Sequence, residues 1–195
     1  FTWDKPKAEW LAEQWDHIAP VKVGGPAYGN LDLDFVPGRY LRDGYVITSR
    51  GCPQRCWFCS VWKRHPEVHE LPIHPGWALQ DDNILACSDS HIRAVFAMLK
   101  QQKKPVHFYG GLEPSFLQDW HVDLFAWLKP KQMFFAYDTP DDLDPLIIAS
   151  EKMREAGFTR QQMRCYVLIG SPKDTMEGAE ERLQRTMSLG HAVAQ

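Results

Sequence analysis

Three cysteines stand close together in one short segment, the stretch GYVITSRGCPQRCWFC from Gly44 to Cys59. Three residues separate Cys52 from Cys56, and two separate Cys56 from Cys59. This spacing lets three thiolates turn towards one centre, and thiolates are the soft ligands that iron–sulfur clusters and zinc prefer. Three sulfurs leave one coordination position open. The segment therefore predicts either a cluster with one free iron or a zinc site that a further residue completes.

A closed zinc site needs four protein ligands. Residues elsewhere in the chain that could supply the fourth are His65, His69, Cys87 and Cys165. The alternative function is then a non-catalytic zinc- or iron–sulfur-binding module. Cys87 and Cys165 lie in apolar runs that we interpret as strands, so the plainer interpretation of both is a small buried hydrophobic residue.

The string CPQRCWFC resembles the CxxxCxφC signature of radical S-adenosylmethionine (SAM) enzymes, with Phe58 as the aromatic residue φ. The wider string TSRGCPxRCxFC is most similar to the branch with methylthiotransferase-like and cobalamin-associated radical enzymes. The resemblance implies that Cys52, Cys56 and Cys59 bind a [4Fe–4S] cluster whose free iron chelates SAM. It also implies that Phe58 packs near the adenine, and that reductive cleavage of SAM gives a 5′-deoxyadenosyl radical acting on an unknown substrate.

The composition is that of an ordinary folded domain. The 195 residues include 22 basic and 25 acidic side chains, and 44% are hydrophobic. A chain of this length buries about 70% of its unfolded surface, so we expect one main domain. The small net charge does not indicate nucleic-acid binding. Because there is no signal peptide and no apolar run of the ~18 residues that span a membrane, we expect a cytoplasmic protein without a membrane partner.

Residues 1–38 are interpreted as an N-terminal helix–strand cap, with a helix over 6–18 and a short strand over 21–23. The glycine- and proline-rich stretch that begins at Gly24 ends this strand. Such an end resembles the tail of a Rossmann-like cobalamin-binding domain, and cobalamin is a further expected cofactor if that domain lies upstream. The plainer alternative is a cap that packs on the main domain.

Residues 39–195 are interpreted as the radical SAM partial barrel core. The chain starts at Phe1 without a methionine and stops at Gln195 just beyond an expected helix. We therefore expect a fragment of a longer protein, with a core that is incomplete at its C-terminal end.

Short apolar runs alternate with segments of helical periodicity through this core. Strands are expected at 45–48, 83–87, 106–109, 133–137 and 165–169. The alternation predicts an α/β fold, a partial (β/α) TIM-like barrel of parallel strands with about five of six βα units present. Parallel strands place their carboxyl ends at one edge, so the side chains that follow them are expected to share one cleft.

The segment after the third expected strand, Gly110-Gly111-Leu112-Glu113-Pro114, is similar to the GGEP motif of radical SAM enzymes. The resemblance implies that Gly110 and Gly111 allow close approach of the cofactor and that Glu113 accepts from the methionyl ammonium group. Two features differ from the family pattern, because Leu112 is inserted and the family motif usually ends the second strand. If 83–87 is the second strand, the competing residues are Asp82, Asn83 and Ser88.

Two further strand ends are implied to contact SAM. The fourth strand ends at Tyr137 and Asp138, where the family places a residue that bonds the ribose hydroxyls, although Asp138 could equally be a turn or capping acid. The fifth ends at Gly170 in a segment that resembles the one beside the adenine. There, Asp174 is expected to cap the following helix.

No residue is identified as an acid or base towards the substrate, so no catalytic side chain is assigned. The proposed chemistry needs an electron donor, and the resemblance implies a reductase or a flavodoxin- or ferredoxin-type protein. Basic side chains surround the cysteines and either steer an acidic donor or substrate or offset the thiolate charge: Arg50, Arg55, Lys63 and Arg64.

Overall fold

A computed structural model describes residues 4–24, 28, 35–39, 41–170 and 174–194. The chain divides into two compact units, Phe1–Asp34 and Phe35–Gln195. Each unit is described by itself. None of the helices in the described ranges is long and apolar enough to cross a membrane.

The first unit holds helix α1 (Lys5–Trp15), close to the expected helix over 6–18. The Asp4 carboxylate accepts from the Lys7 amide at 3.0 Å and caps the helix. Pro6 lies in the first turn, where the N–H group that proline lacks would have no partner within the helix. Residues 21–24 form no strand, so the strand expected at 21–23 is not present.

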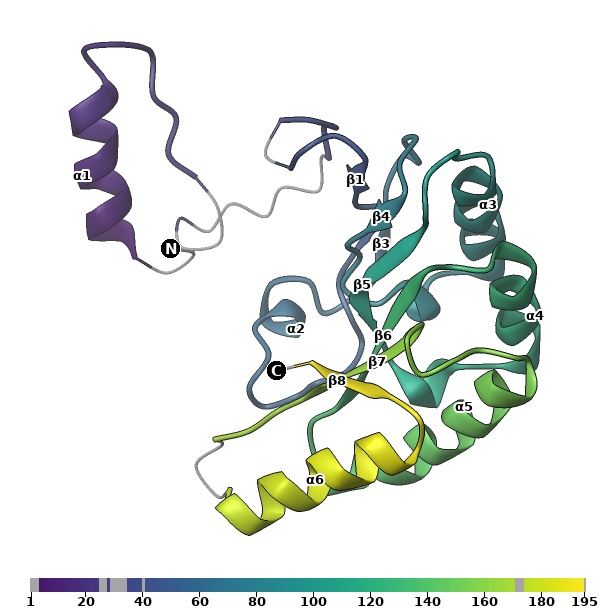
Figure 1. Ribbon diagram of the computed structural model, residues 1–195. Coiled ribbons are helices and arrows are strands. Elements are labelled where there is room, and N and C mark those ends of the chain that lie inside the picture. The colour runs from purple at the N-terminus through teal and green to yellow at the C-terminus, as the bar shows by residue number, and fades with distance from the viewer. Residues whose placement is uncertain (1–3, 25–27, 29–34, 40, 171–173, 195) are drawn as a thin grey trace. The chain divides into compact units, whose positions relative to one another are not determined.

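The second unit is built on a six-stranded parallel sheet with strand order β1-β4-β5-β6-β7-β8 (Figure 1). The strands are β1 (Tyr45–Val46), β4 (Ala78–Leu79), β5 (His107–Leu112), β6 (Gln132–Tyr137), β7 (Met163–Val167) and β8 (Ala192–Ala194). All five strand pairs are parallel. The α/β fold predicted from the sequence is confirmed, with β8 as a strand that the sequence reading did not include.

Four helices connect these strands. They are α3 (Asp89–Lys100), α4 (Asp119–Leu128), α5 (Leu143–Glu155) and α6 (Met176–Ser188). Figure 1 shows α3, α4 and α5 together on one face of the sheet. The apolar residues of α3 that recur at i, i+3, i+4 and i+7 are all buried, as helical periodicity predicts: Ile92, Val95, Phe96 and Leu99.

The core between sheet and helices contains closely packed aromatic rings. The ring centroids of Phe96, Phe108 and Phe125 lie 5.0–5.4 Å apart, and each side chain is at most 1% exposed. Tilted and edge-to-face contacts at this distance add to the free energy of apolar burial. This cluster fixes α3 and α4 on β5 and thereby sets the position of the loops at the strand ends.

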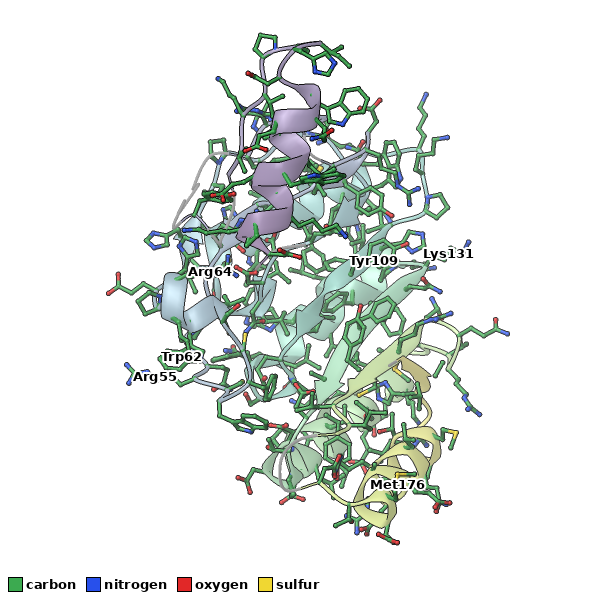
Figure 2. The ribbon with its side chains drawn as sticks, turned by 90° about the vertical axis from the view of Figure 1, so that its left-hand side faces the viewer. Arg55, Trp62, Arg64, Tyr109, Lys131 and Met176 are labelled. Carbon is green, nitrogen blue, oxygen red and sulfur yellow. The ribbon has the colours of Figure 1, made fainter. Side chains whose placement is uncertain are left out.

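The other face of the sheet carries a second row of rings. Tyr45 and Tyr109 stack with centroids 5.8 Å apart, and Phe134 stacks on Tyr166 at 4.8 Å. Figure 2 views the molecule from the side away from α3 to α5, and there Tyr109 lies over the sheet. Aromatic residues of β1, β5, β6 and β7 thus line the face of the sheet opposite α3, α4 and α5.

The second strand of the sheet is β4, not the run Asn83–Cys87 that the sequence suggested. That run forms a 3₁₀ helix, η2 (Ile84–Ala86), in which the Cys87 amide donates to the Ile84 carbonyl at 3.1 Å. A short apolar run looks the same to a periodicity argument whether it is a strand or a buried turn. Here Ile84 and Leu85 are 2% and 4% exposed and pack as the turn that leads into α3.

Candidate functional site

The cysteine loop leaves the sheet after β1 and returns to it before β4. Its base is closed by an antiparallel pair, β2 (Ser49–Arg50) with β3 (His69–Glu70). Gly51 follows β2 with φ +95°, and a Cβ there would lie 2.0 Å from the Glu67 carbonyl oxygen. Only glycine fits both the left-handed backbone and this close approach. The position directly before Cys52 therefore requires glycine, because the Glu67 backbone lies against it.

Hydrogen bonds within the loop order the other two cysteines. The Cys59 amide donates to the Cys56 carbonyl at 3.0 Å, and the Trp62 indole donates to the same carbonyl at 2.9 Å. The Val61 amide, at the start of α2 (Val61–Arg64), lies 3.4 Å from Cys59 Sγ. Figure 2 shows Arg55, Trp62 and Arg64 around α2.

The three thiols of the loop are free and half-buried. Burial, together with the neighbouring thiols of Cys59 and Cys52, raises the pKa of Cys56 to about 11. The thiols of Cys52 and Cys59 therefore lie close enough to that of Cys56 to interact with it electrostatically. No three His, Cys, Asp or Glu side chains in the described ranges converge on one point as ligands of a single metal ion.

The other two cysteines are buried in the core, as expected. Cys165 is 0% exposed within β7, and Cys87 is 9% exposed. Cys87 ends the 3₁₀ helix rather than a strand, so its expected position was wrong although its burial was correct. Burial raises the pKa of both thiols to about 12.

The segment Asp81-Asp82-Asn83 follows β4, and its side chains form hydrogen bonds with the start of the cysteine loop. Asp81 is 2% exposed, and its carboxylate accepts from the Thr48 amide and hydroxyl, both at 2.6 Å, and from the Ser49 hydroxyl at 2.8 Å. The Asp82 carboxylate accepts from the Gly51 amide at 2.8 Å. These bonds tie the end of β4 to the chain just before Cys52.

Asn83, the third residue of this segment, contacts Cys52 directly. Its side-chain amide Nδ2 donates to Cys52 Sγ at 3.7 Å, and the residue is 2% exposed. Sequence reasoning named Asp82 and Asn83 as competitors for a cofactor role, but it did not identify Asp81. The available signal was the pair of acids that follows the apolar residues Ala78 and Leu79 after one glutamine, Gln80.

The two glycines near the end of β5, Gly110 and Gly111, have different surroundings. A Cβ on Gly110 would lie 1.9 Å from the Asp81 carbonyl oxygen, so the close approach that this glycine allows is to the end of β4. A Cβ on Gly111 would meet nothing within 4 Å, so open space remains beside it. The Glu113 carboxylate accepts from the Ser115 amide at 3.2 Å and hydroxyl at 2.8 Å and caps η3 (Pro114–Phe116).

At the end of β6, Tyr137 is 3% exposed and Asp138 is half-buried. The carboxylate that caps the following 3₁₀ helix, η4 (Pro140–Asp142), belongs to Asp142, which accepts from the amides of Asp138 and Thr139 at 3.0 and 2.7 Å. Asp138 is thus not the capping acid. Burial, together with the nearby charges of Asp142 and Glu113, raises the pKa of Asp138 to about 6.

After β7, Gly170 has φ +78°, and its amide donates to the Asp174 carboxylate at 2.9 Å. Asp174 also pairs with Arg182 at 2.7 Å. The N-cap of α6 is Thr175, whose hydroxyl accepts from the Gly178 amide at 3.0 Å, so the expected capping by Asp174 is wrong. Ser171 and Pro172 of the same segment lie outside the described residues.

Two further expected contact residues have different local roles. Phe58 is 37% exposed beside Trp57, with ring centroids 5.4 Å apart, and is free to meet a ligand. Ser88 does not end a strand. It is the N-cap residue of α3, and its hydroxyl accepts from the His91 amide at 3.3 Å. The geometric reason for placing Ser88 at the site is therefore lost.

A cavity of about 480 Å³ lies at the opposite edge of the sheet, where β6, β7 and β8 begin. Its lining is basic and includes Lys129, Lys131, Arg160 and Arg164. Because it opens at the amino ends of the strands, it is separate from the carboxyl edge that carries the cysteine loop.

The fold matches that of a solved structure: a radical S-adenosylmethionine methyltransferase, TsrM, from Kitasatospora setae, with cobalamin and a [4Fe–4S] cluster bound. The TM-score is 0.58 at 15% sequence identity, and the match covers 77% of this chain and 35% of the methyltransferase. This chain therefore spans about a third of that protein, and the likeness concerns the fold. No protein-family model and no curated protein matches the chain.

Proposed function

We propose that the second unit is the core of a radical SAM enzyme, which binds a [4Fe–4S] cluster on Cys52, Cys56 and Cys59 and cleaves SAM reductively to a 5′-deoxyadenosyl radical. The observation that carries this proposal is the position of the cysteine loop. Three free thiols follow the first strand of a six-stranded parallel sheet whose fold is that of a radical SAM methyltransferase. When bound, the cluster would supply the electron that cleaves SAM.

The donor set of the loop fits a cluster. Each cysteine of a cluster ligates a different iron, so the three sulfurs need not converge on one ion as zinc requires. Cys59 and Cys52 also lie near the N–H groups of Val61 and Asn83. Hydrogen bonds to ligand sulfurs are a usual support of iron–sulfur centres.

The charge of the carboxyl edge fits SAM, which carries an ammonium and a sulfonium group. Glu113 and Asp138 are close enough to raise the pKa of Cys56, so both carboxylates lie near the cysteines. We assign the remaining SAM contacts to open positions around them: Phe58, Gly111 and Gly170. Gly110 and Tyr137 would support these positions, because each is packed within the fold, whereas Ser88 is left out because its hydroxyl caps α3.

Two strand ends compete for the methionyl ammonium group. Glu113 follows β5, the third strand, and one of its oxygens already accepts from Ser115. Asp82 follows β4, the second strand, where the family motif is expected, and one of its oxygens accepts from Gly51. We propose Glu113, because the open space beside Gly111 lies on its own strand end.

The proposal includes an electron donor of the reductase, flavodoxin or ferredoxin type. It extends to cobalamin on the condition that a cobalamin-binding domain precedes residue 1 in the full-length protein. The matched methyltransferase binds cobalamin, which supports the extension. A corrinoid absorption spectrum of the full-length protein would test it.

Anaerobic reconstitution tests the proposed function. We expect about four irons and four sulfides per chain, with the brown absorbance of a cluster. Cys52→Ala, Cys56→Ala and Cys59→Ala should each abolish that absorbance, whereas the buried controls Cys87→Ala and Cys165→Ala should retain it. Metal analysis that finds one zinc and no sulfide, or full cluster retention in all three loop variants, would contradict the proposal.

A further inference from the structure

Among the residues that the structure describes, the side chain of Asn83 has one hydrogen-bond partner, the sulfur of Cys52. It is 2% exposed, and its Nδ2 donates to Cys52 Sγ at 3.7 Å. Asn83 precedes η2 as its N-cap residue, but its side chain makes no capping hydrogen bond. In the described part of the chain its buried Oδ1 has no partner either. A buried amide with one unpaired oxygen costs free energy, so this residue is not explained by the stability of the fold.

Both ends of this N–H···S contact are held in place. On the Asn83 side, the Asp81 carboxylate is fixed by three hydrogen bonds from Thr48 and Ser49. On the cysteine side, Gly51 donates to Asp82 and is locked by its own close contact with the Glu67 carbonyl. The amide of Asn83 is therefore preorganised towards Cys52 and pays little conformational entropy to donate.

We propose that Asn83 is a positioning residue that donates a hydrogen bond to the Cys52 sulfur and makes the cluster easier to reduce. The inference rests on the proposed function, because it requires the cluster. Reduction adds one negative charge that spreads onto the ligand sulfurs, so an N–H dipole stabilises the reduced form more than the oxidised form. Removing the donor should then favour the oxidised cluster.

The first test uses the unaltered protein. The chain contains two asparagines, Asn30 and Asn83, so labelling asparagine side chains with ¹⁵N marks two amides only. We expect a ¹⁵N hyperfine coupling in pulsed electron paramagnetic resonance (EPR) spectra of the reduced cluster, and we expect it to persist in labelled Asn30→Gln. A reduced cluster without ¹⁵N coupling would overturn the inference and leave the proposed function intact.

The second test measures the reduction potential by EPR-monitored titration. Asn83→Leu removes the donor, and Asn83→Asp keeps the shape while replacing the N–H by a carboxylate oxygen. We expect the equilibrium constant for reduction to fall about tenfold in Asn83→Leu, which is 59 mV for a one-electron couple, and further in Asn83→Asp. The matched control Gln102→Leu, which removes an amide bonded to the Met98 carbonyl, should leave the potential unchanged.

The outcomes separate the two claims. Full cluster content with unchanged potentials in both Asn83 variants would overturn the role of Asn83 alone. A reconstituted wild-type protein with no cluster signal would overturn both the role of Asn83 and the proposed function. If Asn83→Leu fails to fold, Asn83→Asp and the ¹⁵N measurement on the unaltered chain still decide the question.

Discussion

The carboxylates of Glu113 and Asp138 contribute negative charge to the edge beside the cysteines. Both raise the pKa of Cys56, and Glu113 also raises that of Asp138. Neither residue belongs to the cysteine loop. They can therefore be changed to separate the binding of a cationic cofactor from the binding of the cluster.

Glu113→Ala and Asp138→Ala should weaken SAM binding while cluster content stays unchanged. A lost hydrogen bond to a charged group is worth about 1.5–3 kcal/mol, so the dissociation constant should rise roughly ten- to a hundred-fold. Anaerobic titration calorimetry of the reconstituted protein measures this directly. Asp141→Ala, an exposed acid one turn away, is the control that should bind SAM normally. Wild-type affinity in both site variants would show that the cofactor lies elsewhere.

At the residue scale, the sequence was most informative where the chemistry is local. Cys52, Cys56 and Cys59 lie on one loop, so their spacing was visible without a fold. Asp81 was not visible, because its partner Thr48 lies 33 residues away and only the pairing of β1 with β4 brings them together. Asp174 was assigned the wrong role because Thr175 next to it is an equally good capping residue.

At the scale of strands, the contact between Gly110 and Asp81 holds β5 beside the end of β4. Gly110→Ala would place a Cβ 1.9 Å from the Asp81 carbonyl oxygen, so one strand end has to move. We expect a loss of about 1–3 kcal/mol in the free energy of unfolding, as for other overpacked positions. Gly111→Ala, the neighbouring exchange with no atom within 4 Å, should change it by less than about 0.5 kcal/mol. Urea denaturation of both variants tests this, and equal stability would contradict the packing.

The start of β8 should give the protein an acid-sensitive step. His191 is 0% exposed and bonds the Ser150 hydroxyl of α5 at 2.7 Å, and burial lowers its pKa to about 4. In the unfolded chain the pKa of this imidazole is about 6.5. The folded protein keeps the imidazole neutral, so the full stability is present above pH 6.5 and is lost as the pH falls towards 4. Between pH 7 and pH 4, wild type should lose about 3 kcal/mol more than His191→Gln. Urea unfolding at both values measures the difference, and exposed His17→Gln serves as the control.

Identical pH dependence in wild type and His191→Gln would contradict the burial of a neutral imidazole.

The prediction depends on β8, a strand that the sequence analysis did not include. Its three residues, Ala192–Ala194, are too few for a periodic pattern, and they form a strand because β7 offers a free edge. The segments of helical periodicity expected between the strands are present as α3, α4 and α5, because ten or more residues show the helical period clearly.

For the whole second unit, the sequence predicted the alternation of strands and helices and therefore the parallel sheet. It placed the second strand wrongly, because β4 has two residues whereas the run Asn83–Cys87 is longer and more apolar. This error also affected the site, since the second strand end carries Asp81-Asp82-Asn83 rather than Ser88. The edge at which the strand ends gather was nevertheless correct, because parallel connections alone determine it.

The central claim is that the cysteine loop holds a cluster with one iron open to SAM at the carboxyl edge of this sheet. The most direct test is the EPR spectrum of the reduced, reconstituted protein before and after addition of SAM. We predict that SAM changes the cluster signal, because its amino and carboxylate groups would ligate the open iron, and that methylthioadenosine, which lacks these groups, leaves it unchanged. A cluster signal that is the same with and without saturating SAM would contradict the account.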